Sequence, residues 1–267
     1  MKEKVIKIAV AGVCGRMGSS IISLVSKTTD MKPVWVFEAK NHPSVGTEIL
    51  PGLVVKDALE GCADADVLID FTTPEATIAH LELAEKKKMK AVIGTTGFSK
   101  QESEMIRFFS KEIAVLASPN MSIGVNIMMK IVENAAGLLG KDCEVEIIET
   151  HHHNKKDAPS GTALKLGEII NSVRKREARE GFVYGRSGIQ GPRTSDEIGI
   201  HAVRISEVVG EHIVMFGGKG EILEISHRCF NREAFAGGAL IAARFIVEKP
   251  AGFYQMSDVI EWLRTLP

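Results

Sequence analysis

The first third of the chain alternates short, apolar, β-branched runs with longer segments of helical periodicity. Strands are predicted at residues 5–11, 34–37, 67–71, 91–94 and 114–117, and helices at 18–28, 74–88 and 100–110. Because the strand-like runs are almost wholly apolar, both faces of their sheet must be covered, which is typical of a parallel sheet flanked by helices. Right-handed crossovers then give a doubly wound, Rossmann-type α/β fold.

The pattern changes near residues 119–124. Beyond this point the sequence predicts helices at 126–139 and 162–176, and strands at 143–150, 201–208 and 221–226. Long strands without a helix between each pair indicate an open mixed sheet, and therefore a second domain of the α+β type. A last amphipathic helix is predicted at 232–247.

Composition excludes several classes of protein. Apolar residues make up 45% of the 267-residue chain, which is enough for a sizeable core, and the net charge of −1 offers no positive field to attract nucleic acid. No apolar run approaches the roughly 18 residues of a membrane span. Cysteines stand singly, which indicates reduced thiols rather than a disulfide framework. We therefore expect a soluble cytoplasmic protein with neither a nucleic-acid nor a membrane partner.

A glycine-rich turn joins the first predicted strand to the first helix. Gly12, Gly15 and Gly18 have the spacing G-x-x-G-x-x-G, which suits a tight turn, close approach of a pyrophosphate and close packing of helix on strand. Phosphates would then lie at the helix N-terminus. Glu38 follows 20 residues after Gly18, at the end of the second strand, where a carboxylate can accept hydrogen bonds from ribose hydroxyls. The combination predicts dinucleotide binding.

The residues around Glu38 bear on which dinucleotide binds. A carboxylate there repels a 2′-phosphate, and Ala39 and Lys40 follow without an arginine. NADH is therefore favoured. Lys40 could still allow some use of NADPH, or it could be an ordinary solvated charge on the surface. The loops 94–97 and 118–121 follow two further strands and are suited to the nicotinamide half, although such loops are more often plain turns.

The segment 149–162 is the most unusual in the chain, with three adjacent histidines and two lysines before a helix start. Ser160 is a suitable helix N-cap, and free N–H groups beyond it would bind a carboxylate. Lysine and histidine can supply charge and a proton. Two alternatives are a metal site on His151 and His153, which the neighbouring lysines oppose, and a solvated loop without chemistry.

The chain resembles the 4-hydroxy-tetrahydrodipicolinate (dihydrodipicolinate) reductase family of diaminopimelate and lysine biosynthesis. The resemblance runs nearly end to end and rests on AGVCGRMG (11–18), DFTTPEAT (70–77), IGTTGF (93–98), SPNMSIGVN (118–126), EIIETHHHNKKDAPSGTAL (146–164), VVGEH (208–212) and GFYQMSDVI (252–260). It implies a dinucleotide-binding domain over 1–122, a substrate-binding and oligomerisation domain over 123–231, and a C-terminal helix, 232–267, that packs back on the first domain. It also implies a homotetramer.

The resemblance further implies site residues. His151 and Lys155 match the proton-donating pair, and the substrate ligands correspond to His152, Lys155, Ser160, Gly161 and Thr162. The cofactor contacts correspond to Gly12, Val13, Cys14, Gly15, Arg16, Met17, Glu38, Gly94, Thr95, Thr96, Ser118, Pro119, Asn120 and Met121. Two positions depart from the family: His153-Asn154 replaces an Arg-His pair, and Ala39 stands where an arginine is common.

The resemblance thus predicts an NAD(P)H-dependent oxidoreductase that reduces a cyclic dicarboxylate imine, with hydride from the nicotinamide and a proton from His151, aided by Lys155. Because the two binding regions are expected on separate domains, we also expect a hinge closure during turnover. Two other functions stay open: a dehydrogenase of another aspartate-derived metabolite, and a regulator that binds NADH without turning it over.

Overall fold

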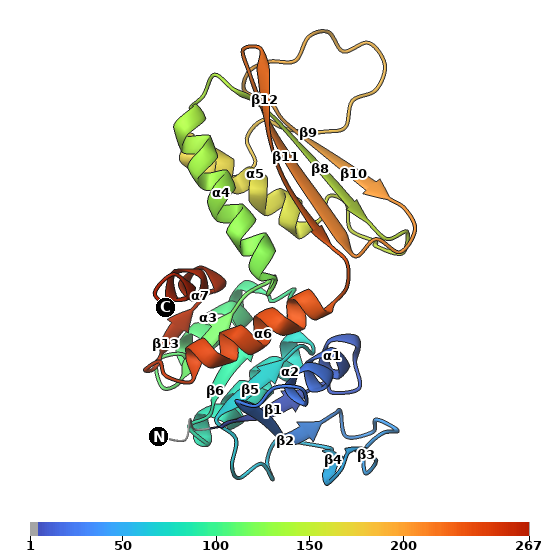
Figure 1. The fold of residues 1–267 in the computed structure, drawn as a ribbon, viewed down its shortest axis with the longest axis vertical. Helices are drawn as coiled ribbons and strands as arrows, with labels where there is room; N and C mark the ends of the chain where they lie inside the picture. Colours follow the sequence, from blue (N-terminus) through green and yellow to red (C-terminus); the bar gives the residue numbers. More distant parts are fainter. Residues whose placement is uncertain (1–4, 267) are drawn as a thin grey trace. The chain divides into compact units, whose positions relative to one another are not determined.

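The computed structural model describes residues 5–266, which fold as two compact units. One unit is formed by the chain up to Ile123 together with the residues from Arg232 onward, and the other by Gly124–Asn231. Figure 1 shows that the first unit is an open sheet with helices on both faces, and that the second is a sheet with two helices on one side. The two units are described separately below.

The first unit contains an eight-stranded sheet in the order β13-β7-β6-β5-β1-β2-β4-β3. Its strands run parallel except β3, which is antiparallel to β4. The elements are β1 (Ile6–Ala11), α1 (Arg16–Val25), β2 (Met31–Phe37), β3 (Glu48–Leu50), β4 (Leu53–Lys56), β5 (Val67–Asp70), α2 (Pro74–Lys86), β6 (Lys90–Ile93), α3 (Lys100–Phe109), β7 (Ala114–Ala117), α6 (Glu233–Ile246), β13 (Gly252–Tyr254) and α7 (Met256–Leu263). The predicted doubly wound sheet is confirmed.

Alternate residues of β1 belong to two different cores. Ile8 and Val10 pack in a cluster with α1, α6 and α7, whereas Ala9 and Ala11 pack in a cluster with α2 and α3. Successive side chains of a strand point to opposite faces, so the sheet is buried on both sides. This arrangement explains why its strands are continuous apolar runs.

The second unit contains a five-stranded sheet in the order β12-β11-β8-β10-β9. Strand β8 runs parallel to β10 and antiparallel to β11, which makes the sheet mixed, as predicted. Its elements are α4 (Ile123–Leu139), β8 (Glu144–His151), α5 (Gly161–Val173), β9 (Phe182–Tyr184), β10 (Ile198–Arg204), β11 (Gly210–Gly218) and β12 (Glu221–Cys229). Residues of α4 and α5 share one core with β8 and β10.

Three expectations about elements were wrong. The predicted strand 201–208 begins at Ile198 and ends at Arg204, because the chain turns at Ser206, which has a positive φ of 49°. Strand β11 was not predicted, although it is an inner strand of the second sheet, between β12 and β8. Residues 232–267 are not one helix, since β13 separates α6 from α7 and pairs with β7. A three-residue strand is too short to show a periodicity.

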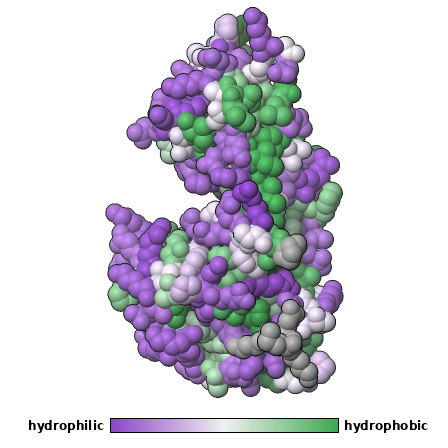
Figure 2. Space-filling model, turned by 60° about the vertical axis from the view of Figure 1, so that its left-hand side comes forward, coloured by the Kyte–Doolittle hydropathy of each residue, from purple (hydrophilic) through white to green (hydrophobic). Residues whose placement is uncertain are grey.

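The surface carries apolar side chains on the second unit. Figure 2 shows hydrophobic residues gathered over this unit, while hydrophilic residues cover most of the rest of the visible face. Exposed apolar residues include Ile127, Ile131 and Leu138 on α4, and Ile222 and Leu223 on β12. No helix in residues 5–266 is both long enough and apolar enough to span a bilayer.

Candidate active site

The histidine- and lysine-rich segment lies between the end of β8, at His151, and the start of α5, at Gly161. Ser160 is the N-cap of α5, as predicted, and its side-chain oxygen accepts a hydrogen bond from the backbone N–H of Ala163 at 3.2 Å. The N-terminus of α5 therefore lies at the same end of the second sheet as the last residues of β8.

Glu149 and His151 form a buried carboxylate–imidazole pair. They are two residues apart on β8, so their side chains point to the same face of the strand. The distance between His151 Nδ1 and Glu149 Oε2 is 2.5 Å. Glu149 is 0% exposed and His151 is 8% exposed. This pairing places the proton of the imidazole ring on Nδ1 and leaves Nε2 as the nitrogen that can face a ligand.

Arg204 and Ser160 hold the Glu149 carboxylate from two other elements. The guanidinium of Arg204, the last residue of β10, donates to both carboxylate oxygens at 2.8 Å, and the Ser160 N–H donates to Oε1 at 3.0 Å. Burial raises the pKa of Glu149, but the hydrogen bonds from His151 and Arg204 outweigh it and lower the pKa to about 2. Glu149 is therefore a carboxylate at neutral pH.

His212 and Gly210 of β11 complete the surroundings of His151. The His212 ring meets the His151 ring edge-on, with centroids 5.2 Å apart, and its Nε2 lies 3.0 Å from the Ser160 hydroxyl. Burial, and then the charge of His151, lower the pKa of His212 to about 3, so this ring is neutral. A Cβ on Gly210 would lie only 3.1 Å from His151 Nε2.

The remaining predicted residues lie along the connection to α5. Lys155 Nζ is paired with a carboxylate oxygen of Asp157 at 2.9 Å, and the Lys155 side chain is 21% exposed. His152 is partly exposed, whereas the His153 side chain turns away to bond the carbonyl of Ser206 at 2.8 Å. His153 therefore ties this connection to the β10–β11 loop.

The N-terminus of α5 opens onto free space. Gly161 is exposed, and a Cβ placed on it would meet no atom within 4 Å. The first N–H groups of a helix lack partners within the helix and carry partial positive charge. With Lys155, they give this end of the second unit the properties of an anion site, next to a histidine that can donate a proton.

A second candidate site lies at the glycine-rich turn of the first unit. Gly12 adopts a positive φ of 64°, and a Cβ on Gly18 would lie 2.2 Å from the Gly12 carbonyl oxygen. Glycine adopts the first conformation without strain, and only glycine permits the second contact. The turn thus brings the N-terminus of α1 against the end of β1, as the glycine spacing predicts.

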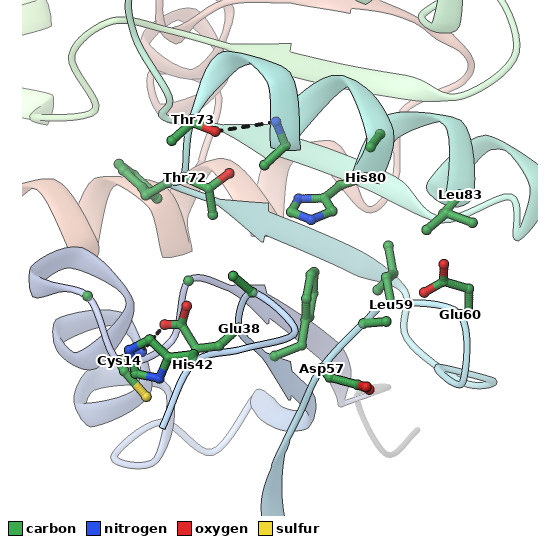
Figure 3. A pocket seen from close by; sticks show the side chains of 18 residues that line it. Cys14, Glu38, His42, Asp57, Leu59, Glu60, Thr72, Thr73, His80 and Leu83 are labelled. Atoms are coloured by element: carbon green, nitrogen blue, oxygen red, sulfur yellow. Dashed lines mark hydrogen bonds between the residues drawn. The ribbon is translucent and has the colours of Figure 1, made fainter. Parts of the chain in front are cut away.

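Beside this turn is a pocket with a volume of about 610 Å³. We call it the nucleotide pocket, after the dinucleotide binding that the glycine spacing predicts. Its lining residues include three acidic ones, Glu38, Asp57 and Glu60, and no lysine or arginine (Figure 3). Glu38 Oε1 accepts the backbone N–H of Cys14 at 2.7 Å, which fixes the carboxylate beside the turn. The pocket fits an uncharged sugar with hydroxyl donors better than a phosphate.

The structure brings only some of the predicted cofactor contacts to this pocket. Gly12, Cys14, Gly15 and Glu38 line it. The others lie outside it: Val13, Arg16, Met17, Gly94, Thr95, Thr96, Ser118, Pro119, Asn120 and Met121. The Val13 and Met121 side chains are buried in the core, so only their main chains can reach a ligand. Lys40, which left NADPH open, does not line the pocket either.

Several site residues were not predicted. Glu149, Arg204 and His212 surround His151, and His80 lines the nucleotide pocket with its Nδ1 2.8 Å from a carboxylate oxygen of buried Asp70. Glu149 was detectable, since it precedes His151 by two positions on one strand. Arg204 and His212 could be found only from the register of β10 and β11 on β8.

The metal alternative at His151 and His153 finds no geometric support. Strand β8 ends at His151, so the two side chains do not continue one face, and His153 bonds a carbonyl instead. Within residues 5–266, one cluster of three metal-ligand side chains occurs, and it lies at the nucleotide pocket: Cys14, Glu38 and His42.

Comparison with known proteins places this chain in one family over nearly its whole length. Family models match residues 6–121 as dihydrodipicolinate reductase, N-terminus, and residues 124–260 as dihydrodipicolinate reductase, C-terminus. The 4-hydroxy-tetrahydrodipicolinate reductases of Syntrophus aciditrophicus and Nitrosomonas europaea are 44% and 41% identical over 263 and 262 residues. Those alignments cover 96% of this chain and 98% of each relative.

Solved structures agree with this assignment. A dipicolinate-bound dihydrodipicolinate reductase from Paenisporosarcina sp. TG-14 superposes with a TM-score of 0.78 at 27% identity, covering 94% of this chain and 97% of that one. A meso-diaminopimelate dehydrogenase mutant from Clostridium tetani shares the fold, with a TM-score of 0.59 at 12% identity, covering 98% of this chain and 97% of that one. The chain therefore belongs to the dihydrodipicolinate reductase family, whose members are NAD(P)-dependent oxidoreductases of diaminopimelate and lysine biosynthesis.

Proposed function

We propose that this protein reduces 4-hydroxy-tetrahydrodipicolinate, or its dehydrated form dihydrodipicolinate, to tetrahydrodipicolinate with NADH. The observation that carries the proposal is the combination at the end of β8: a histidine held by a buried carboxylate, next to a lysine and an open helix N-terminus. A dianionic ring that must gain a proton requires these features together.

The cationic groups of the site bind the two substrate carboxylates. One carboxylate binds Lys155 and the N–H groups at Gly161 and Thr162, beyond the Ser160 cap, and His152 orients the other. Asp157 pairs with Lys155 in the structure, so an incoming carboxylate must replace Asp157 as the partner. The ion pair with Asp157 therefore keeps the Lys155 ammonium in position, and because Asp157 is exposed, a substrate carboxylate can replace it.

The proton comes from His151. With Nδ1 bonded to Glu149, the Nε2–H of the imidazolium is the group that donates to C3 of the substrate ring. Ionised Glu149 stabilises the positive charge on His151 before transfer. A positioned general acid typically contributes about 10²–10⁴-fold to the rate. Lys155 helps by stabilising the negative charge that develops on the ring.

When bound, the cofactor would supply a hydride to C4 of the ring. In the first unit, residues Gly12–Met17, which lead into α1 and form its first turn, would hold the pyrophosphate, and Glu38 would accept hydrogen bonds from the adenosine ribose. The loops 94–96 and 118–121 would hold the nicotinamide half. Three acidic residues line the pocket and no lysine or arginine does, which favours NADH over NADPH because a 2′-phosphate would be repelled.

Steady-state kinetics with the product of dihydrodipicolinate synthase tests the proposal. We expect NADH oxidation to depend on this product and not on aspartate semialdehyde or oxaloacetate, which excludes another dehydrogenase of aspartate-derived metabolites. We also expect Lys155→Ala to raise KM and lower kcat, because the charge acts in binding and in the transition state. NADH binding without oxidation would instead indicate a regulator.

The family resemblance also leads us to propose a cytoplasmic homotetramer. The four cysteines are free thiols, which suits a reducing compartment. Ile222 of β12 is 68% exposed in the single chain, and assembly would remove such side chains from water. Light scattering coupled to size exclusion measures the mass directly, and a monomer would contradict the assembly.

A further inference from the structure

The nucleotide pocket contains a cluster of three potential metal ligands, of which Glu38 also belongs to the proposed cofactor site. Cys14 of the glycine turn, Glu38 at the end of β2 and His42 of the following loop each offer one ligand atom, and these atoms all lie within 4.8 Å of one another. Figure 3 shows the three side chains together at one edge of the pocket. Cys14 is exposed, and the other two are partly exposed, so the cluster is open to solvent.

The donor set is one that a zinc-like cation selects. Thiolate sulfur, imidazole nitrogen and carboxylate oxygen bind Zn²⁺ at about 2.0–2.3 Å, and three protein ligands with an open fourth position are typical of accessible zinc sites. Ligand atoms within 4.8 Å need only small side-chain rotations to meet one ion. Mg²⁺ and Ca²⁺ prefer oxygen ligands, so the thiol and the imidazole favour a softer metal.

Charge in the pocket also favours a cation. Asp57 and Glu60 line the same cavity as Glu38, and no lysine or arginine lines it. Acidic residues around one cavity favour a divalent cation there. Asp57 and Glu60 lie on another segment of the chain than Cys14, Glu38 and His42.

The ligands are already held near their positions. Glu38 Oε1 accepts the backbone N–H of Cys14 at 2.7 Å, which holds the carboxylate beside the turn that carries the thiol and leaves the other carboxylate oxygen for an ion. The His42 N–H donates to the Ala39 carbonyl at 2.8 Å, and His42 Nδ1 accepts the Ser44 N–H at 3.2 Å. That long bond to Ser44 is readily exchanged for a metal–nitrogen bond.

The geometry points to a zinc-binding site formed by Cys14, Glu38 and His42, at which Zn²⁺ and the dinucleotide exclude each other. On binding, the Cys14 thiol loses its proton to solvent and the thiolate bonds the metal, without any change in oxidation state. Exclusion follows because the metal takes the Glu38 carboxylate that the ribose hydroxyls would use. This second part rests on the proposed cofactor site, whereas metal binding itself does not.

Titration with Co²⁺ in place of Zn²⁺ tests the metal site without any assay of activity. Coordination by thiolate gives an intense ultraviolet charge-transfer band together with visible bands of a tetrahedral ion. We expect one equivalent to bind with these bands, Zn²⁺ to displace it, Cys14→Ser to abolish the charge-transfer band, and His42→Ala to weaken binding at least about tenfold. His153→Ala, which removes an exposed histidine elsewhere, is the matched control and should leave binding unchanged.

Three outcomes would overturn the metal site. One is the absence of Co²⁺ binding at about 1 mM, and another is a band that persists in both Cys14→Ser and His42→Ala. A band lost in His153→Ala would instead place the metal at the histidine cluster, which also contradicts the proposal. Circular dichroism of each variant checks that it is folded.

Thiol labelling provides an independent measurement. Cys14 is exposed and the other three cysteines are buried, so a disulfide reagent should label the native protein once. We expect both Zn²⁺ and NADH to protect this thiol, and Zn²⁺ at ten times its dissociation constant to raise the apparent NADH dissociation constant about tenfold. Protection by Zn²⁺ with unchanged NADH affinity would overturn the exclusion. Absence of NADH binding with intact Co²⁺ binding would count against the proposed function and not against the metal site.

Discussion

The two candidate sites handle charge in opposite ways. At the end of β8 a buried carboxylate, Glu149, is neutralised by Arg204 and His151 through direct hydrogen bonds. In the nucleotide pocket Glu38, Asp57 and Glu60 line a cavity that no lysine or arginine lines. The first arrangement suits an anionic ligand that must be protonated, and the second suits a ligand that offers hydroxyl donors. The two sites thus differ in charge, and this difference matches each site to a different ligand.

Replacing the proton donor should break the first site most severely. We expect His151→Gln to lower kcat about 10²–10⁴-fold, with a smaller rise in KM, because glutamine keeps the size of the side chain but cannot protonate the ring carbon. His153→Gln is the control, since His153 bonds a backbone carbonyl away from Glu149. Steady-state kinetics measures both variants, and an unchanged kcat for His151→Gln would rule out its role.

Adding a cation to the nucleotide pocket should shift the cofactor preference towards NADPH. Ala39 lines the nucleotide pocket next to Glu38. We expect Ala39→Arg to raise kcat/KM for NADPH relative to NADH by about tenfold, because a guanidinium can pair with the 2′-phosphate. Ala39→Gln adds comparable length without charge and serves as the control. If both variants shift the ratio equally, charge does not set the preference.

Blocking the open helix end should weaken substrate binding only. A methyl group at Gly161 clashes with no protein atom but occupies the space before the N-terminus of α5. We expect Gly161→Ala to raise KM for the substrate about tenfold while KM for NADH stays unchanged. The matched control is Gly137→Ala in α4, where a Cβ also fits without a clash. A normal substrate KM for Gly161→Ala would place the carboxylate elsewhere.

The last expected effect is on stability rather than on activity, and it appears in mild acid. The pKa of His212 is about 3 in the folded protein against an ordinary value of 6.5, because the ring is buried. Between these values the unfolded chain binds the extra proton, so stability falls as pH drops below 6.5. We expect the wild type to lose about 2 kcal/mol more than His212→Gln between pH 7.5 and 5, measured by urea unfolding. Equal losses would contradict a neutral buried His212.

The sequence predicted the first unit better than the second for a physical reason. Strands such as 114–117 are short apolar runs separated by helices, so their period and their neighbours follow from the chain order. In the second unit β11 is flanked by glycines and β10 ends four residues earlier than predicted, because the sheet there is assembled from pairings that local pattern does not specify.

The same distinction applies to the sites. His151, Lys155 and the Ser160 cap are neighbours in sequence, so composition and a helix-start pattern bring them together. Arg204 reaches Glu149 only through the pairing of β10 with β8. Asp57 and Glu60 reach the pocket of Glu38 only through the chain beyond β4, and nothing near Glu38 in the sequence indicates them.

A crystal structure with pyridine-2,6-dicarboxylate bound tests the central claim most directly, because this planar dianion mimics the substrate and cannot be reduced by the bound cofactor. We predict density for one carboxylate at Lys155 and the N–H groups of Gly161 and Thr162, with the ring next to His151 Nε2 and Asp157 released from Lys155. Density for the dianion away from α5, or an intact Lys155–Asp157 pair beside it, would contradict the account.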